Sequence, residues 1–455
     1  MRLTNTLTGT KEEFTPGGET VTMYVCGLTP YEEAHIGHAM SAIVFDVLRR
    51  YLEFRGHRVR HVQNFTDVDD RIIERARQRG VRPEDLAARY IDRYFEDLHA
   101  LNVLPAHEYP FATREIPEMI TIIQTLIDRG YAYVADNGDV YYRVRRKEDY
   151  GKLSHRSVDS LLAGARVEPG EVKEDPLDFA LWKAAKPGEP QWDSPWGPGR
   201  PGWHIECTAM SLKYLGHPID IHGGGMDLVF PHHENEIAQS EAYLGEASFV
   251  RYWVHNGWLT LGGEKMSKSL GNIISIREGL ERYGADALRL FVLNSHYRSP
   301  LSYAEESLEA AVRGAERLRT AARTPGPAPE DGAPVDPAPF RARFVEAMED
   351  DLNTPRALAA LFDLATEINR GRDAGRPVES AQSALLELAG VLGLRLEEPA
   401  ADLAAAPFID LLVEVRSALR AARQYALADR VRDRLGELGV ALEDTPQGTV
   451  WKRRA

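Results

Sequence analysis

Hydrophobic and polar positions in the first 65 residues switch between strand-like and helix-like patterns. An apolar run predicts a strand over residues 21–26, an amphipathic stretch predicts a helix over 36–54, and a second strand follows Gly56 over 59–65. Strand, helix and strand in this order form a βαβ unit with parallel strands. Ligands in such folds bind at the loops that leave the carboxyl ends of the strands, where Cys26 and the acidic turn Asp67-Val-Asp-Asp70 lie.

The pattern changes at residue 116. Five apolar residues at helical spacing predict an amphipathic helix: Ile116, Met119, Ile120, Ile123 and Ile127. A hairpin over 131–144 follows, around the turn-forming Asp136-Asn-Gly138. Because a strand and a helix with the second cysteine come later, we expect residues 115–200 to form an insertion between two halves of one nucleotide-binding fold.

The last third of the chain is predicted to be helical. Frequent proline over residues 324–339 is typical of an extended linker, which marks a domain border. Beyond it, apolar residues recur at helical spacing and predict a helical bundle: Phe344, Met348, Leu352, Leu358, Leu361, Phe362 and Ala365. The expected fold class is therefore α/β, with a Rossmann-like parallel-sheet domain, an α+β insertion and a C-terminal helical bundle.

Composition narrows the class of protein. The 455 residues are 43% hydrophobic and 27% charged, which is ordinary for a soluble chain of several domains. No apolar run approaches the roughly 20 residues that cross a bilayer, and the N-terminus shows no signal peptide, so we expect a cytoplasmic protein. The net charge of −14 argues against wholesale non-specific binding of nucleic acid, yet it leaves room for a local basic surface.

Two segments suggest phosphate chemistry. His35-Ile-Gly-His38 opens a helix after a strand, so backbone N–H groups, the helix dipole and two imidazoles could meet a phosphate there. Lys265-Met-Ser-Lys-Ser269 lies among glycines and carries two ammonium groups and two hydroxyls. Each segment alone has an ordinary structural explanation, a helix end or an exposed turn, but the two together favour a nucleotide site.

The only two cysteines belong to a candidate metal site. Two cysteines cannot build a disulfide framework, so both thiols stay available to a metal. Downstream, His232 and Glu236 are four residues apart on one helical face, and His233 and Glu236 are three apart, so spacing alone does not choose between the histidines. Cys26 and Cys207 with one histidine and Glu236 make a ligand set that suits zinc. Two buried cysteines beside a solvated helix are the structural alternative.

The sequence pattern alone does not assign a role to several other residues. The carboxylates of Asp67, Asp69 and Asp70 could hold magnesium, a ribose or an ammonium group, but an acidic turn that caps a helix explains them equally well. Trp203 lies nearest to Cys207 and is the tryptophan that best suits a pocket wall. Near the end of the chain, Arg416, Arg420, Arg423 and later basic residues could contact phosphates, or simply form a solvated charged face.

Six motifs in order resemble the cysteine-specific family of class I aminoacyl-tRNA synthetases, over essentially the whole chain. They are Met23-Tyr-Val-Cys-Gly-Leu-Thr-Pro-Tyr31, His35-Ile-Gly-His38, Gly202-Trp-His-Ile-Glu-Cys207, His222-Gly-Gly-Gly, Pro231-His-His-Glu-Asn-Glu236 and Lys265-Met-Ser-Lys-Ser269. Asp351-Leu-Asn-Thr-Pro355 and the tail from Leu442 to Trp451 extend the resemblance. It implies activation of L-cysteine with ATP and transfer to the 3′-terminal ribose of tRNA(Cys).

The resemblance also implies roles for individual residues. One zinc ion per chain would be held by Cys26, Cys207, His232 and Glu236, which selects His232 over His233. ATP, with Mg²⁺, would contact the two signature segments, with His35, His38, Lys265 and Lys268 as catalytic residues. The further implied ATP contacts are Gly37, Met266, Ser267 and Ser269. The implied cysteine contacts are Thr29, Trp203, His222 and Gly223.

Domain functions follow from the same resemblance. We expect no editing domain, because a zinc–thiolate bond separates cysteine from serine far better than an apolar pocket does. The chain is expected to act as a monomer, away from membranes. The expected division is a catalytic domain at 1–260, a signature-loop and stem-contact region at 261–323, a linker at 324–339, a helical tRNA-binding domain at 340–400 and a small anticodon-recognition domain at 401–455.

Two alternatives to a tRNA ligase remain at this stage. A related ligase joins cysteine to an amino sugar in mycothiol synthesis and would share the activation motifs and the zinc. Its family lacks the anticodon-binding end, so the Pro-rich linker, the helical region and the Gln447-Gly-Thr-Val-Trp451 tail favour the synthetase. A catalytically silent zinc-containing RNA-binding protein is the other alternative, and the intact His35 and Lys268 argue against it.

Overall fold

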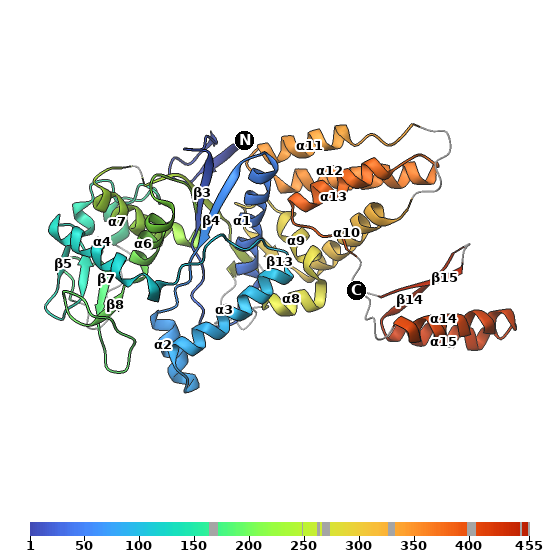
Figure 1. The fold of residues 1–455 in the computed structure, drawn as a ribbon, viewed down its shortest axis with the longest axis horizontal. Helices are drawn as coiled ribbons and strands as arrows, with labels where there is room; N and C mark the ends of the chain where they lie inside the picture. Colours follow the sequence, from blue (N-terminus) through green and yellow to red (C-terminus); the bar gives the residue numbers. More distant parts are fainter. Residues whose placement is uncertain are drawn as a thin grey trace.

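A computed structural model of the chain describes residues 1–162, 172–247, 249–261, 264–265, 274–325, 333–397, 406–445 and 448–453. The N-terminal half of the molecule is built on a parallel sheet, the C-terminal half on helices (Figure 1). No helix among these residues is both long and apolar enough to span a membrane.

The central sheet has four parallel strands in the order β10-β9-β3-β4. Helix α1 (Ile36–Phe54) connects β3 to β4, so the predicted βαβ unit is confirmed. Because β3 pairs with β4 on one side and with β9 on the other, the sheet has a topological switch point between β3 and β9, where α/β folds bind ligands. The strands are β3 (Thr20–Val25), β4 (Arg58–Gln63), β9 (Ile219–Gly225) and β10 (Val250–Asn256).

The predicted insertion forms its own antiparallel sheet, in the order β5-β6-β7-β8. Helix α4 (Ile116–Asp128) and the hairpin of β5 (Ala132–Val134) and β6 (Val140–Tyr142) confirm the helix and hairpin expected from the sequence. Helices α4, α6 and α7 share one hydrophobic core with this sheet. The remaining elements are α5 (Val158–Leu162), β7 (Phe179–Ala184), β8 (Gly199–Pro201), α6 (Trp203–Leu215) and α7 (Glu234–Leu244).

Two further parts flank the sheet. Helices α2 (Asp70–Arg79) and α3 (Pro83–Ala100) pack on each other and extend away from it (Figure 1). A hairpin of β1 (Arg2–Asn5) and β2 (Thr10–Glu13) contacts β10. After β10 the chain forms a small sheet in the order β12-β11-β13: β11 (Leu259–Leu261), β12 (Glu264–Lys265) and β13 (Leu301–Tyr303).

The helical region packs directly against the N-terminal half. One hydrophobic core contains Leu48 of α1, Leu288 of α9, Leu318 of α10 and Leu361 of α12, so it includes described residues on both sides of the predicted linker. The helices are α8 (Ile276–Tyr283), α9 (Ala285–Leu293), α10 (Glu305–Arg323), α11 (Ala338–Glu349), α12 (Thr354–Asp373) and α13 (Glu379–Val391).

The C-terminal residues form a small separate unit. Its two helices pack on each other and on a two-stranded antiparallel hairpin, and the unit stands apart at one end of the molecule (Figure 1). It consists of α14 (Ala406–Ala421), α15 (Tyr425–Glu437), β14 (Val440–Thr445) and β15 (Gly448–Arg453).

Candidate metal centre and active site

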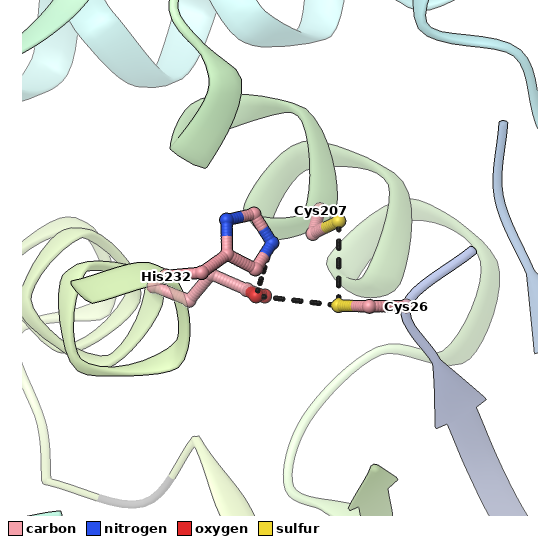
Figure 2. A group of neighbouring side chains, drawn as sticks. Cys26, Cys207 and His232 are labelled. Atoms are coloured by element: carbon pink, nitrogen blue, oxygen red, sulfur yellow. Dashed lines mark hydrogen bonds and ion pairs between the residues drawn. The ribbon is translucent and has the colours of Figure 1, made fainter. Parts of the chain in front are cut away.

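Four side chains distant in sequence meet at the switch point (Figure 2). Cys26 follows β3, Cys207 lies on α6, and His232 and Glu236 come from the start of α7 and the turn before it. Their ligand atoms all lie within 4.8 Å of one another. The two Sγ atoms are 3.6 Å apart, close to the about 3.8 Å that tetrahedral Zn–S bonds of 2.3 Å would give. The residues present therefore fit a zinc ion.

A second ligand set overlaps the first. One ligand atom from each of four residues, Cys26, His222, His233 and Glu236, also lies within 4.8 Å of the others. Like the sequence spacing, the geometry therefore does not choose between His232 and His233 as the metal ligand. The Nε2 atom of His233 is 3.2 Å from the Cys26 Sγ atom. Its Nδ1 atom, however, hydrogen-bonds to His255 Nε2 at 2.7 Å. His233 is thus also hydrogen-bonded to His255, which belongs to neither ligand set.

Two members of this histidine cluster were not singled out from the sequence. His204 Nδ1 lies 2.9 Å from His232 Nδ1, and His255 Nδ1 lies 2.7 Å from the Thr6 hydroxyl. His204 thus orients His232, and His255, held by Thr6, orients His233 through its Nε2 atom, as partners of metal-binding histidines commonly do. His255 could have been found, because it lies near the carboxyl end of β10, at the edge of the sheet where ligands bind.

The charges of the four side chains depend on one another. Burial, the Cys207 thiol and the Glu236 carboxylate raise the pKa of Cys26. Burial also acts to raise the pKa of Cys207, but hydrogen bonding to Cys26 and the nearby His232 outweigh it and lower that pKa to about 6. For His232, burial acts to lower the pKa, whereas Glu236 and Cys207 raise it to about 10. A site with one ready thiolate and a buried carboxylate attracts a soft divalent cation.

The start of α1 is shaped by its two histidines. His35 is the N-cap residue, and its Nδ1 atom accepts a hydrogen bond from Gly37 N at 3.1 Å. His38 Nδ1 accepts from His35 N at 3.1 Å, and the rings stack with centroids 3.9 Å apart. A Cβ atom at Gly37 would lie 2.9 Å from the His35 ring, so this position requires glycine. Both imidazoles are therefore fixed at the positive end of the helix dipole.

The described residues on either side of the second signature segment lie in β12 and beside the start of α1. Glu264 and Lys265 form β12, which pairs with β11. Residues 266–273, and with them Met266, Ser267, Lys268 and Ser269, lie outside the described residues, as does the side chain of Lys265. Directly after them, Ile276 N donates to Ala34 O and Ile36 N donates to Ile274 O. The first described residues after the segment are thus hydrogen-bonded to the start of α1.

The predicted cysteine contacts lie around the candidate metal site. Trp203 is 38% exposed and stacks on His232, with ring centroids 4.4 Å apart. His222 is buried, with Nε2 3.6 Å from the Cys26 Sγ atom, and half-buried Thr29 follows in the turn after Cys26. Gly223 O accepts from Cys26 N, and a Cβ atom there would lie 2.2 Å from the Phe45 ring. Gly223 is therefore needed for the packing of β9 on α1.

The acidic turn has structural partners. Asp67 accepts from Thr113 N and Oγ1, and Asp69 caps α2 by accepting from Arg71 N. Asp70 forms ion pairs with Lys183 and Arg200 of the insertion. Burial acts to raise the pKa of Asp70, but these two cations outweigh it and lower the pKa. The turn thus ties α2 and the insertion together.

Basic residues of the C-terminal unit are largely paired within it. The buried Arg416 forms a bidentate pair with Asp444, which also contacts Arg420. Arg432 and Lys452 likewise face carboxylates of the same unit. Two arginines of the helix face predicted to contact phosphates, Arg416 and Arg420, therefore also form ion pairs within the unit.

The chain matches two family descriptions. Residues 14–313 match the model of the class I (C) tRNA synthetase catalytic domain, and residues 343–397 match the DALR domain. Among curated proteins, the chain is 58% identical to a cysteine--tRNA ligase of Dehalococcoides mccartyi, over 99% of both proteins. It is 52% identical to a cysteine--tRNA ligase of Desulforudis audaxviator over the full length of both.

Solved structures agree on the fold. A methionyl-tRNA synthetase of Mycobacterium tuberculosis, in complex with methionyl-adenylate, superimposes with a TM-score of 0.59 at 18% identity, covering 87% of this chain and 94% of that one. This likeness supports the class I architecture of a parallel sheet followed by helices. With the catalytic-domain match and the full-length relatives, it follows that the chain belongs to the cysteine--tRNA ligase family of class I aminoacyl-tRNA synthetases.

Proposed function

We propose that this protein activates L-cysteine with ATP to cysteinyl adenylate and then transfers the cysteinyl group to the 3′-terminal ribose of tRNA(Cys). The observation that carries the proposal is the meeting of Cys26, Cys207, His232 and Glu236 at the switch point of the sheet. Relatives over 50% identical are named cysteine--tRNA ligases, which supports the same conclusion.

Zinc is the proposed resident metal, held by the set Cys26, Cys207, His232 and Glu236. When bound, it supplies a soft Lewis acid that favours the thiolate of cysteine over the hard hydroxyl of serine. The chain's own residues would shape the pocket around that thiol. Trp203, stacked on His232, would cover the substrate on its exposed side, and Thr29, His222 and Gly223 would line the rest.

ATP is proposed to bind at the start of α1. The positive end of the α1 dipole favours phosphate there, and His35, Gly37 and His38 would contact it. Lys265, Met266, Ser267, Lys268 and Ser269 would cover the phosphates from the other side, with Lys265 and Lys268 neutralising the charge of the leaving pyrophosphate. Mg²⁺ would accompany the nucleotide and offset the charge of its phosphates.

Transfer RNA is the proposed macromolecular partner. We assign the helical region at 340–400 and the unit at 401–455 to binding of tRNA(Cys), with the smaller unit reading the anticodon, and residues 261–323 to contact with the stem. The DALR match at 343–397 supports the first assignment. We further propose a monomer that works in the cytoplasm.

One experiment separates this function from its alternatives. Cysteine-dependent exchange of pyrophosphate into ATP should be seen with the purified protein, followed by charging of tRNA(Cys). Exchange with ligation of cysteine to an amino sugar, and no charging, would instead identify the mycothiol-type ligase, which the DALR match does not favour. Absence of exchange would overturn both enzymatic assignments and leave a zinc-containing RNA-binding protein.

A further inference from the structure

A buried ion pair joins the helix that carries the signature histidines to the helical region. Asp46 of α1 and Arg289 of α9 are both fully buried, with Arg289 Nη2 2.5 Å from Asp46 Oδ2. The same oxygen accepts from Arg50 Nε at 2.8 Å, and Leu104 N donates to Oδ1 at 2.8 Å. One carboxylate therefore holds two guanidinium groups and the chain that follows α3.

The remaining donors of both arginines point at two helix C-termini. Arg289 Nε donates to Leu392 O, the C-cap residue of α13, at 2.9 Å, and its Nη1 donates to Leu101 O, the C-cap residue of α3, at 3.0 Å. Arg50 donates to Gly390 O and Asn102 O. Carbonyls at helix ends lack partners within the helix, so Arg289 satisfies Leu392 O and Leu101 O, which burial would otherwise leave unpaired. Arg50 adds a second contact to Gly390 O, which already accepts from Gly393 N.

The charges at this site balance. Arg50 and Arg289 contribute two positive charges, and Asp46 contributes one negative charge. The C-termini of α3 and α13 each add the equivalent of about −0.5 charge from the helix dipole, which brings the sum close to zero. The two positive charges are therefore fully balanced only when the C-terminal end of α13 packs against α1 and α9.

The geometry at α13 leaves almost no freedom. Gly393 has φ +71°, and a Cβ atom there would lie 2.0 Å from Arg289 Nη2. The Asn102 side chain donates to Gly393 O at 2.7 Å, and nearby Asp286 accepts from Arg395 N and Leu396 N at 2.9 Å each. Directional bonds to backbone fix the orientation of a helix as well as its position.

We propose that Asp46 and Arg289 are positioning residues that set the angle between the helical region and α1, and that this angle is required for transfer of the amino acid to tRNA but not for its activation. The inference rests on the proposed function. Activation uses only small substrates at the catalytic sheet, whereas transfer needs the 3′ end of a tRNA held elsewhere on the helices. Helix α12 alone is about 30 Å long, so a tilt of about 5° would move its far end by about 3 Å. Misplacements of that size strongly reduce reaction rates.

The first test acts from the side of α13. It disturbs the contacts of Asp46 and Arg289 that connect α1, α9 and α13, which we call the joint. In Gly393→Ala the new methyl group displaces the Arg289 guanidinium. We expect charging of tRNA(Cys) to fall by about 5- to 150-fold in kcat/KM, the range of typical coupling between sites, while cysteine-dependent exchange changes less than about twofold. Gly56→Ala is the control for backbone strain, because Gly56 has φ +90° and open space around it; Gly390→Ala is the control for position, since it also faces open space. Both controls should charge normally.

The second test removes the two fully buried charges of the pair together, while Arg50 keeps its bonds to Gly390 O and Asn102 O. Loss of one partner would leave the other buried and unpaired, so Asp46→Leu is combined with Arg289→Met, a type of replacement that folded proteins often tolerate. The double variant should show the same selective loss of charging. If it does not fold, as judged by thermal melting, Asn102→Gly serves in its place, since glycine keeps the left-handed backbone of Asn102 (φ 59°) and removes only the bond to Gly393.

The outcomes separate the two proposals. Charging that falls with exchange preserved supports the joint. Equal loss of both activities, or no change in either, in Gly393→Ala and in the second variant overturns it, because the residues then serve stability alone or do not affect transfer. Absence of exchange and charging in the unmodified protein would instead overturn the proposed function.

Discussion

Replacing His61 with leucine is expected to make the protein less sensitive to acid. His61 lies on β4, is 6% exposed, and neither ring nitrogen has a hydrogen-bond partner among the described residues. Burial lowers its pKa from 6.5 to about 3; the charged Arg49 and His107 act in the same direction, and Asp46 opposes them. The folded protein therefore keeps this imidazole neutral, whereas the unfolded chain protonates it below pH 6.5.

The sign and size of the effect follow from proton linkage. A depressed pKa in the folded state means that stability is lost as the pH falls from about 6.5 toward 3. At pH 5.5 the unfolded chain gains about 1.4 kcal/mol from protonation of this group, and at pH 4.5 about 2.7 kcal/mol. These values depend little on the folded pKa, because that pKa lies well below both pH values. His61→Leu removes this penalty and leaves no buried polar group unpaired.

Urea unfolding at pH 8 and pH 5.5 measures the effect. The free energy of unfolding of the His61→Leu variant should fall between these pH values by about 1.4 kcal/mol less than that of the wild type. His99→Leu, at an exposed position on α3, is the control and should leave the pH dependence unchanged. A His61→Leu variant that loses stability in parallel with the wild type would show that His61 is not held neutral in the fold.

Three further predictions concern the site and its support. Cys207→Ser should weaken zinc binding by more than about 100-fold, because even partners of metal ligands contribute 10- to 100-fold; zinc per chain measured by atomic emission, with ATP affinity unchanged, checks this, and full zinc content would contradict the ligand set. Trp203→Ala should raise KM for cysteine in the exchange assay by about 2- to 12-fold through loss of aromatic contact, and an unchanged KM would remove Trp203 from the pocket. Asp351→Ala should lower the free energy of unfolding by about 3–5 kcal/mol, since buried Asp351 accepts from Thr4 N, Thr4 Oγ1 and Tyr297 OH. Asp351→Asn, which tolerates the same left-handed backbone, should lose clearly less in thermal or urea melting; equal losses would contradict the role of its charge.

Much of the fold follows from local patterns in the sequence. The helix over 36–54 has the predicted bounds, and the strands before and after it differ from their predicted bounds by one or two residues, because period and turn residues encode them locally. The order of strands in the sheet is not local. Pairing of β9 with β3 brings Cys207 within reach of Cys26. This contact depends on packing between residues that lie 181 positions apart in the chain.

Residues whose roles depend on tertiary contacts are the least predictable from the sequence. Spacing leaves the acidic turn open between a ligand site and a helix cap, and its partners are distant in the chain: Thr113 precedes the insertion and Lys183 lies within it. Nothing in the local pattern around Arg289 distinguishes it from a surface arginine, because its acceptors are backbone carbonyls of distant helices. Spacing also could not choose between His232 and His233, and the fold places both near Cys26.

The separation of the metal ligands along the chain has a consequence for the order of events during synthesis. The four ligands span residues 26 to 236, and the insertion lies between the first and the second. A ribosome must therefore deliver over half of the polypeptide before all four donors coexist. The proposed zinc would therefore bind late, and only to chains in which both halves of the sheet have come together.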